Sequence, residues 1–225
     1  MWGAPLEQAW LRYREWLQGN APELANQLRP PANEASIQGL EEVVGGPLPI
    51  EVTQWWRLND GQGDGEMGVL AGFQFLSVAE AQAEWRQWAG LRAHSSAREL
   101  QDLNKSALSL APGAIQRVYT HPGWVPLWKE PLEGNYLGVD LAPGPQGHVG
   151  QVINFGRDED DKAVLARSLA ELIEWLDRQA EQGCVRPHSV RTRSGKQLLE
   201  LRHVRGRVLT VLLQEAREKL RRGGD

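Results

Sequence analysis

The chain has 225 residues, 41% hydrophobic and 24% charged, which is the composition of an ordinary globular protein, and it carries a formal net charge of −4 at pH 7. Its single cysteine, Cys184, excludes an intrachain disulfide and a cysteine-based zinc cluster. No apolar run approaches the roughly 18 residues that cross a bilayer, and residues 1–7 lack the regions of a secretory signal, so we expect a cytoplasmic protein without membrane contact.

Helical periodicity dominates the first third of the chain. Apolar residues recur at three- and four-residue steps from Leu6 to Leu17, which predicts a helix that starts near Pro5 and ends at Gly19-Asn20. Asn33 is a predicted N-cap for a helix that stops at Gly45-Gly46-Pro47. Further helices are predicted at residues 22–28, 49–58, 77–91, 97–103 and 168–183, the last from a capping box formed by Ser168 and Glu171.

Strand patterns occupy the middle of the chain. Alternating apolar residues at 136–141 predict a half-buried strand, and Pro143-Gly144-Pro145-Gln146-Gly147 predicts a turn. The other predicted strands cover residues 69–70, 73–75, 117–120, 124–128 and 150–155. Helices and strands are largely segregated, which favours an α+β fold with a central, mostly antiparallel sheet packed with helices. We expect an N-terminal helical extension at 1–32, an α+β domain at 33–183 and a basic extension at 184–225.

The predicted C-terminal extension differs in charge from the rest of the chain. Residues 1–183 carry 14 Lys and Arg against 25 Asp and Glu, whereas residues 184–225 carry 11 against 4. A hairpin is predicted over 185–201, followed by a basic amphipathic helix over 208–220. The extension could dock onto the acidic body, mediate oligomerisation or bind nucleic acid. Its lack of interleaved aromatic residues argues against nucleic acid.

Ten tryptophans are more than a chain of this length usually holds. Because each indole buries a large area, most are expected in the core. Trp55 and Trp56 are adjacent on a predicted helix, where their side chains point about 100° apart. We expect one ring in the core and the other over a neighbouring helix or groove.

Several short motifs occur in a distinctive order. They are Leu48-Pro49, Leu58-Asn59-Asp60-Gly61, Trp124-Val125-Pro126-Leu127, Gly134-Asn135-Tyr136-Leu137 with Asp140, Pro143-Gly144-Pro145, Gly150-Gln151-Val152-Ile153 and Ser168-Leu169-Ala170-Glu171-Leu172. Together they resemble the SUKH superfamily over roughly residues 33–182. The resemblance implies an α+β domain without catalytic activity. Fungal members of that superfamily include the yeast cell-wall assembly and glucan-synthesis regulator, and bacterial members are commonly immunity proteins against polymorphic toxins.

The residue patterns give no support for catalysis. The glycine-rich segment 61–65 lacks the Gly-Lys-Ser/Thr of a P-loop, no G-x-S-x-G elbow is present, and no two histidines have metal-ligand spacing. His121 and His148 lie in predicted turns, where a hydrogen-bonded structural role is the simplest interpretation. We therefore predict no catalytic residues, no cofactor and no metal.

The densest acidic run is Asp158-Glu159-Asp160-Asp161. It lacks the ligand spacing of a calcium loop, so it is either a solvated loop or a contact for a basic partner. Our predicted partner-binding residues are Asp64, Glu66, Asp158, Glu159, Asp160 and Asp161.

The leading hypothesis is a non-enzymatic bacterial immunity protein. It would bind a basic toxin domain, such as a nuclease, through its acidic surface and occlude the toxin's active site. The alternative is a regulatory scaffold protein related to the fungal regulators of cell-wall synthesis. An enzyme would instead require a buried polar constellation around a deep pocket.

Overall fold

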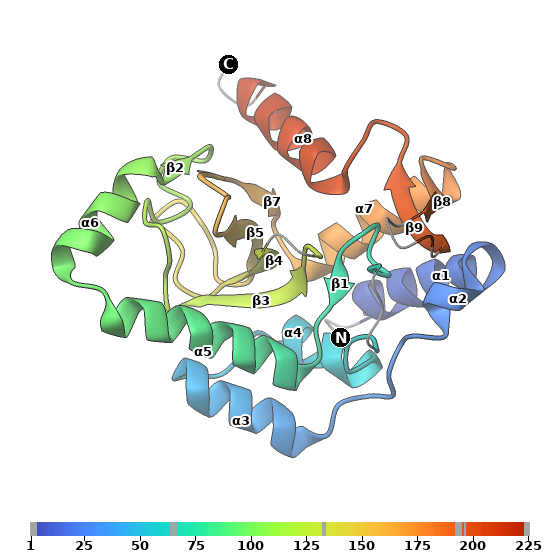
Figure 1. Ribbon diagram of the computed structural model, residues 1–225, viewed down its shortest axis with the longest axis horizontal. Coiled ribbons are helices and arrows are strands. Elements are labelled where there is room, and N and C mark those ends of the chain that lie inside the picture. The colour runs from blue at the N-terminus through green and yellow to red at the C-terminus, as the bar shows by residue number, and fades with distance from the viewer. Residues whose placement is uncertain (1–3, 64–66, 132–133, 192–194, 196, 223–225) are drawn as a thin grey trace.

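The computed structural model describes residues 4–63, 67–131, 134–191, 195 and 197–222. Its helices surround a central sheet, and a hairpin and a final helix follow at the C-terminal end (Figure 1). The helices are α1 (Ala4–Asn20), α2 (Pro22–Ala25), α3 (Glu34–Val44), α4 (Ile50–Leu58), α5 (Val78–His94), α6 (Ala97–Ser106), α7 (Leu169–Glu181) and α8 (Val208–Arg222). The strands are β1 (Gln74–Phe75), β2 (Leu108–Ser109), β3 (Trp124–Lys129), β4 (Asn135–Asp140), β5 (Gln151–Gly156), β6 (Asp161–Lys162), β7 (Val164–Ala166), β8 (Val185–Arg191) and β9 (Gln197–His203).

The central sheet has the strand order β1-β3-β4-β5-β7, and every neighbouring pair is antiparallel. The predicted α+β class is therefore confirmed. Pro126 lies inside β3, where the register with β4 shifts between Pro126 and Trp128. A bulge is one of the few places in a sheet that tolerates proline, because proline cannot donate to the ladder.

Both faces of the sheet are covered, so the prediction of a half-buried strand at 136–141 was wrong. All six residues of β4 are buried. On one face, the Tyr136 hydroxyl donates to Glu84 Oε2 of α5 at 2.6 Å. On the other face, the ring of Trp128 lies 5.5 Å from that of Trp55 in α4. Successive side chains of β4 therefore point to opposite faces of the sheet, and both faces are buried.

An aromatic core joins α1, α4 and the sheet. Trp10, Trp55, Trp56 and Trp128 are all fully buried. The Trp55 ring lies 4.6 Å from that of Trp10, while Trp56 Nε1 donates to the Leu76 carbonyl at 3.0 Å. The expectation that only one of Trp55 and Trp56 is in the core was wrong, because α4 is enclosed on two sides and buries rings that point in different directions.

The motifs that carry the SUKH resemblance hold loops in place. Asn59 accepts a hydrogen bond from Trp10 Nε1 at 3.0 Å and donates one to the Arg29 carbonyl at 2.6 Å. Asp140 is fully buried and accepts from the Ala142 amide at 2.9 Å and from Gln151 Nε2 at 3.0 Å. Both polar side chains therefore have hydrogen-bond partners inside the protein, as most buried polar groups do.

Residues 117–120 form no strand, with a bend at 118–119, so the strand predicted there was wrong. The Tyr119 amide donates to Asn104 Oδ1 at 2.7 Å, and Arg117 Nε donates to the Ala107 carbonyl at 2.9 Å. These bonds direct the segment toward α6 and away from the sheet. The sequence did not predict two pairings, because they involve only two or three residues. Strand β2 pairs parallel with β6, and β7 pairs with β5 at the edge of the sheet.

The C-terminal extension contains the predicted hairpin and helix. Strands β8 and β9 pair antiparallel from Val185–His203 to Arg191–Gln197. Helix α8 then lies against β7 and extends outward toward the C-terminus (Figure 1). The predicted division at residues 32 and 183 stays a prediction, although Trp10 and Val185 belong to the same hydrophobic cluster. In the part of the chain that the structure describes, no helix is long and apolar enough to cross a membrane.

Candidate interaction surfaces

The predicted acidic run lies between β5 and β7, and most of its carboxylates already have partners within the chain. Asp158 pairs with Arg157 at 2.9 Å, and Glu159 accepts from Asn154 Nδ2 at 2.7 Å. Asp161 pairs with Arg217 of α8 at 2.8 Å. Asp158 and Asp160 are exposed, whereas Glu159 and Asp161 are half-buried. The structure therefore brings these four residues together, and their role toward a partner stays a prediction.

A buried lysine lies beneath this acidic run. Lys162 is fully buried, its Nζ donates to the Glu159 carbonyl at 2.9 Å, and it lies 5.7 Å from the Trp124 ring centroid. Burial lowers the pKa of Lys162, although the carboxylates of Glu159, Asp160 and Asp161 act in the opposite direction. Burial likewise raises the pKa of Glu159. Through these contacts Lys162 holds the acidic loop against the buried ring of Trp124.

The other two predicted partner-binding residues, Asp64 and Glu66, lie outside the described residues. They therefore stay an expectation from the sequence. Among the residues that are described, His, Cys, Asp and Glu side chains form no group of three that could hold a metal ion. His121 accepts a hydrogen bond from the Gly123 amide at 3.0 Å, and burial together with Arg92 lowers its pKa.

Helix α8 docks onto the acidic body through two kinds of contact. Its first half buries Val211 and Leu212. Further along, Arg217 pairs with Asp161, and Lys219 lies 3.7 Å from Glu171. Docking of the basic extension was one of three interpretations of the sequence, and these contacts place the helix on the edge formed by β7.

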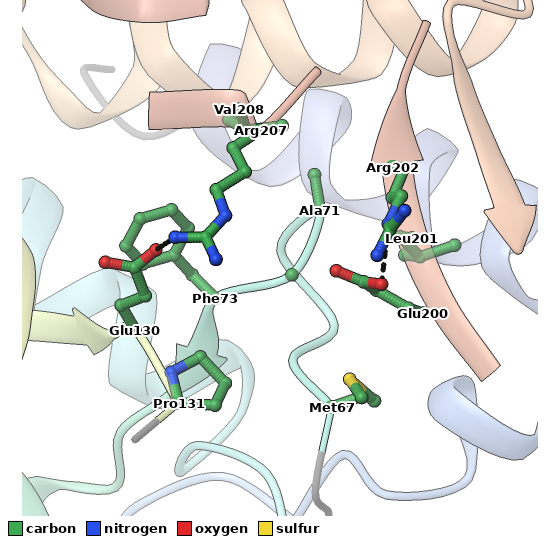
Figure 2. A pocket seen from close by; sticks show the side chains of 11 residues that line it. Met67, Ala71, Phe73, Glu130, Pro131, Glu200, Leu201, Arg202, Arg207 and Val208 are labelled. Atoms are coloured by element: carbon green, nitrogen blue, oxygen red, sulfur yellow. Dashed lines mark hydrogen bonds and ion pairs between the residues drawn. The ribbon is translucent and has the colours of Figure 1, made fainter. Parts of the chain in front are cut away.

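A cleft of about 230 Å³ separates the main sheet from the C-terminal extension. Figure 2 shows two ion pairs on opposite sides of the turn that contains Ala71. Arg207 pairs with Glu130 at 3.2 Å on one side, and Arg202 pairs with Glu200 at 2.7 Å on the other. Between them the lining is mostly apolar. The main domain contributes Met67, Ala71, Gly72, Phe73, Glu130 and Pro131, and the extension contributes Glu200, Leu201, Arg202, Arg207 and Val208.

The turn beneath the cleft has a strained backbone. Leu70 and Phe73 exchange hydrogen bonds in both directions, which closes a two-residue turn at Ala71 and Gly72. Both turn residues have positive φ, 50° for Ala71 and 102° for Gly72. Such a turn favours Asn or Gly, and alanine there carries strain of order 1 kcal/mol. Among the described residues, Ala71 is the one non-glycine with positive φ.

The sequence did not point to this cleft. Its residues come from three separate segments that only the folded chain brings together. One signal was available: the hairpin predicted over 185–201 carries Arg186 on its first strand, and Arg202 follows directly after its second strand.

Comparison with known proteins identifies the family of the chain. The model of the SMI1 / KNR4 family (SUKH-1) matches residues 31–175, which is more than half of the chain. The chain belongs to this family. The matched segment runs from the loop before α3 into α7 and contains the whole central sheet, so the resemblance predicted from the motifs is confirmed.

Curated relatives in fungi match a larger share of the chain. The cell wall biosynthesis/cell cycle regulator smi1 of Schizosaccharomyces pombe is 38% identical over 186 residues, 80% of this chain and 37% of the relative. The glucan synthesis regulatory protein of Neurospora crassa is 32% identical over 204 residues, 78% of this chain and 38% of the relative. The cell wall assembly regulator SMI1 of Saccharomyces cerevisiae is 31% identical over 204 residues, 78% of this chain and 40% of the relative.

The chain spans less than half the length of these relatives. Their names describe regulators, which fits a non-enzymatic SMI1 / KNR4 protein. They support our alternative, the regulatory scaffold, better than the leading immunity hypothesis, and they give no support for a toxin as the partner.

Proposed function

We propose that this chain is a non-catalytic protein-binding module that acts as a regulatory scaffold, as in the control of cell-wall synthesis. The observation that carries the proposal is the similarity to fungal regulators over about four fifths of the chain. It extends well beyond residues 31–175, the segment that defines the family.

The geometry supports protein binding through two surface features. The first is the cleft beside the C-terminal hairpin, which combines an apolar lining with charged walls. Interfaces commonly pair an apolar centre with a polar rim. The second is the acidic loop, where Asp158 and Asp160 remain exposed.

The test is affinity capture of the full chain from its own host, followed by reconstitution of each complex from purified proteins. A scaffold should yield more than one protein that binds directly with a defined stoichiometry. An immunity protein should instead yield one tightly bound toxin domain, and removal of its gene should cause toxicity. If no captured protein binds the purified chain, the proposal is wrong.

A further inference from the structure

We propose that the cleft and the exposed face of the β8–β9 hairpin bind an extended acidic segment of a partner protein, with one apolar side chain of that segment seated in the cleft. This inference rests on the proposed function and names the surface and the chemistry of the partner. Four features of the described residues support it.

The first feature is a pair of like charges on the hairpin. Arg186 of β8 and Arg202 of β9 are directly opposite in the register, so both side chains lie on the same face. Both residues are exposed. Like charges placed directly opposite destabilise a strand pair. Glu200 offsets part of the charge of Arg202, and an anionic ligand between the two guanidinium groups would reduce the repulsion that remains.

The second feature is the difference in exposure between the two members of each ion pair in the cleft. The Arg202 side chain is 53% exposed and its partner Glu200 is 22% exposed. On the opposite wall, Arg207 is 69% exposed and Glu130 is 14% exposed. The carboxylates are therefore less exposed than the guanidinium groups on both walls. An approaching segment meets positive charge first, which favours an acidic sequence.

The third feature is the size and lining of the cleft. Its volume of about 230 Å³ lies below the roughly 300–1,000 Å³ of sites that hold drug-sized molecules. Phe73, Leu201 and Met67 contribute apolar surface to it. A cavity of this kind suits one leucine-sized or phenylalanine-sized side chain of a peptide better than a cofactor.

The fourth feature is the strand that forms one wall. Within the described ranges, the sheet that contains β9 has two strands, so β9 pairs with β8 alone. An edge strand can hydrogen-bond an extended peptide by strand addition. Nucleic acid is the less favoured anion, because base stacking needs several aromatic rings and Phe73 is the one aromatic residue among the described residues that line the cleft.

The experiment measures fluorescence anisotropy of a labelled decapeptide titrated with the full chain. The probe contains Glu, Asp and Gly around one central Leu. A second peptide replaces Leu with Ser, a third replaces the acids with Lys, and a single-stranded oligonucleotide serves as competitor. We expect the acidic Leu peptide to bind, the Ser peptide to bind more weakly and the Lys peptide not to bind.

Variants then locate the site. Arg202→Glu and Arg186→Glu should each weaken binding of the acidic Leu peptide by about tenfold, because attraction to the rim becomes repulsion. The matched control is Arg221→Glu, an exposed arginine near the outer end of α8, which should change affinity by less than about twofold. Met67→Trp, which fills the cleft, should weaken binding of the Leu peptide and leave the Ser peptide unchanged. Near-ultraviolet circular dichroism checks that each variant is folded.

Three outcomes would overturn the inference: no binding of the acidic peptide, equal losses in Arg202→Glu and Arg221→Glu, or displacement by the oligonucleotide with the same pattern of variant effects. The last would assign the surface to nucleic acid. Failure here is distinguishable from failure of the proposed function. If captured partner proteins still bind Arg202→Glu with unchanged affinity, the scaffold function stands and only the assignment of the cleft is wrong.

Discussion

The aromatic core and the outer half of α8 are held in place by different forces. Around Trp55, rings from α1, β1 and β3 pack within 5.5 Å, all of them fully buried. The outer half of α8 is instead held by Arg217 and Lys219, whose ion pairs remain largely exposed. Exposed pairs contribute little to stability. The comparison teaches that the fold does not depend on the charged surface, so that surface can serve recognition.

The largest effect is expected in the aromatic core. Trp55→Ala leaves a cavity among packed rings and should lower the free energy of unfolding by about 3–5 kcal/mol. Denaturant unfolding followed by tryptophan fluorescence measures this. The control is Leu11→Ala, since Leu11 is 48% exposed and its loss should cost less than about 0.5 kcal/mol. Similar costs for both variants would contradict the account of the core.

A second pair of substitutions tests backbone packing in the sheet. A Cβ added at Gly138 would lie 2.2 Å from the Val125 carbonyl oxygen of the neighbouring strand. Gly138→Ala should therefore destabilise the protein by about 1–3 kcal/mol. At Gly90, inside α5, a Cβ would meet nothing within 4 Å, and Gly90→Ala should stabilise by up to about 1 kcal/mol. If Gly138→Ala also stabilised the protein, the two strands would be packed less closely at Gly138 than the 2.2 Å approach indicates.

A third prediction concerns the buried Lys162. Because burial lowers its pKa in the folded protein, the unfolded chain binds more protons than the folded chain between the lowered value and the ordinary pKa of about 10.4. The free energy of unfolding should therefore rise with pH in that window. Comparing wild type with Lys162→Met from about pH 7 to about pH 9.5 isolates this contribution, since other groups cancel. Parallel pH profiles would mean that the lysine titrates normally.

The smallest effect is expected at the outer half of α8. Arg217→Glu removes the ion pair with Asp161 and should cost less than about 1 kcal/mol, less still at high salt. Hydrogen exchange should show faster exchange of the last turns of α8 and unchanged protection of β4. Arg221→Glu changes the same charge one turn further along and should leave exchange near wild type. A global loss of protection in Arg217→Glu would show that the outer half of α8 also stabilises the whole fold.

The sequence allowed prediction of features that local chemistry determines. Caps such as Asn33 and Ser77, and turns that require glycine, such as Gly45, set helix boundaries within a few residues. Burial on two faces was not predictable, because alternation in β4 looks the same whether the second face meets water or α5. The cleft was missed for a related reason: Arg202, Glu130 and the turn at Ala71 are distant in sequence and meet only after the hairpin docks.

Local chemistry also explains why the motifs predicted the family but did not decide between an immunity protein and a regulatory scaffold. Asn59, Asp140 and Gln151 stand in the motifs of the family, and their side chains bond to loops of the protein itself. Residues of this kind identify the fold. They carry no information about the partner, so regulators and immunity proteins can share them.

The most direct test of the central claim is reconstitution of captured partner proteins with the purified full chain, with crosslinks mapped by mass spectrometry. We predict at least one stoichiometric protein complex whose crosslinks fall on the C-terminal hairpin and the cleft walls, and whose affinity drops in Arg202→Glu but not in Arg221→Glu. A purified chain that binds none of the captured proteins would contradict the claim that it is a protein-binding module.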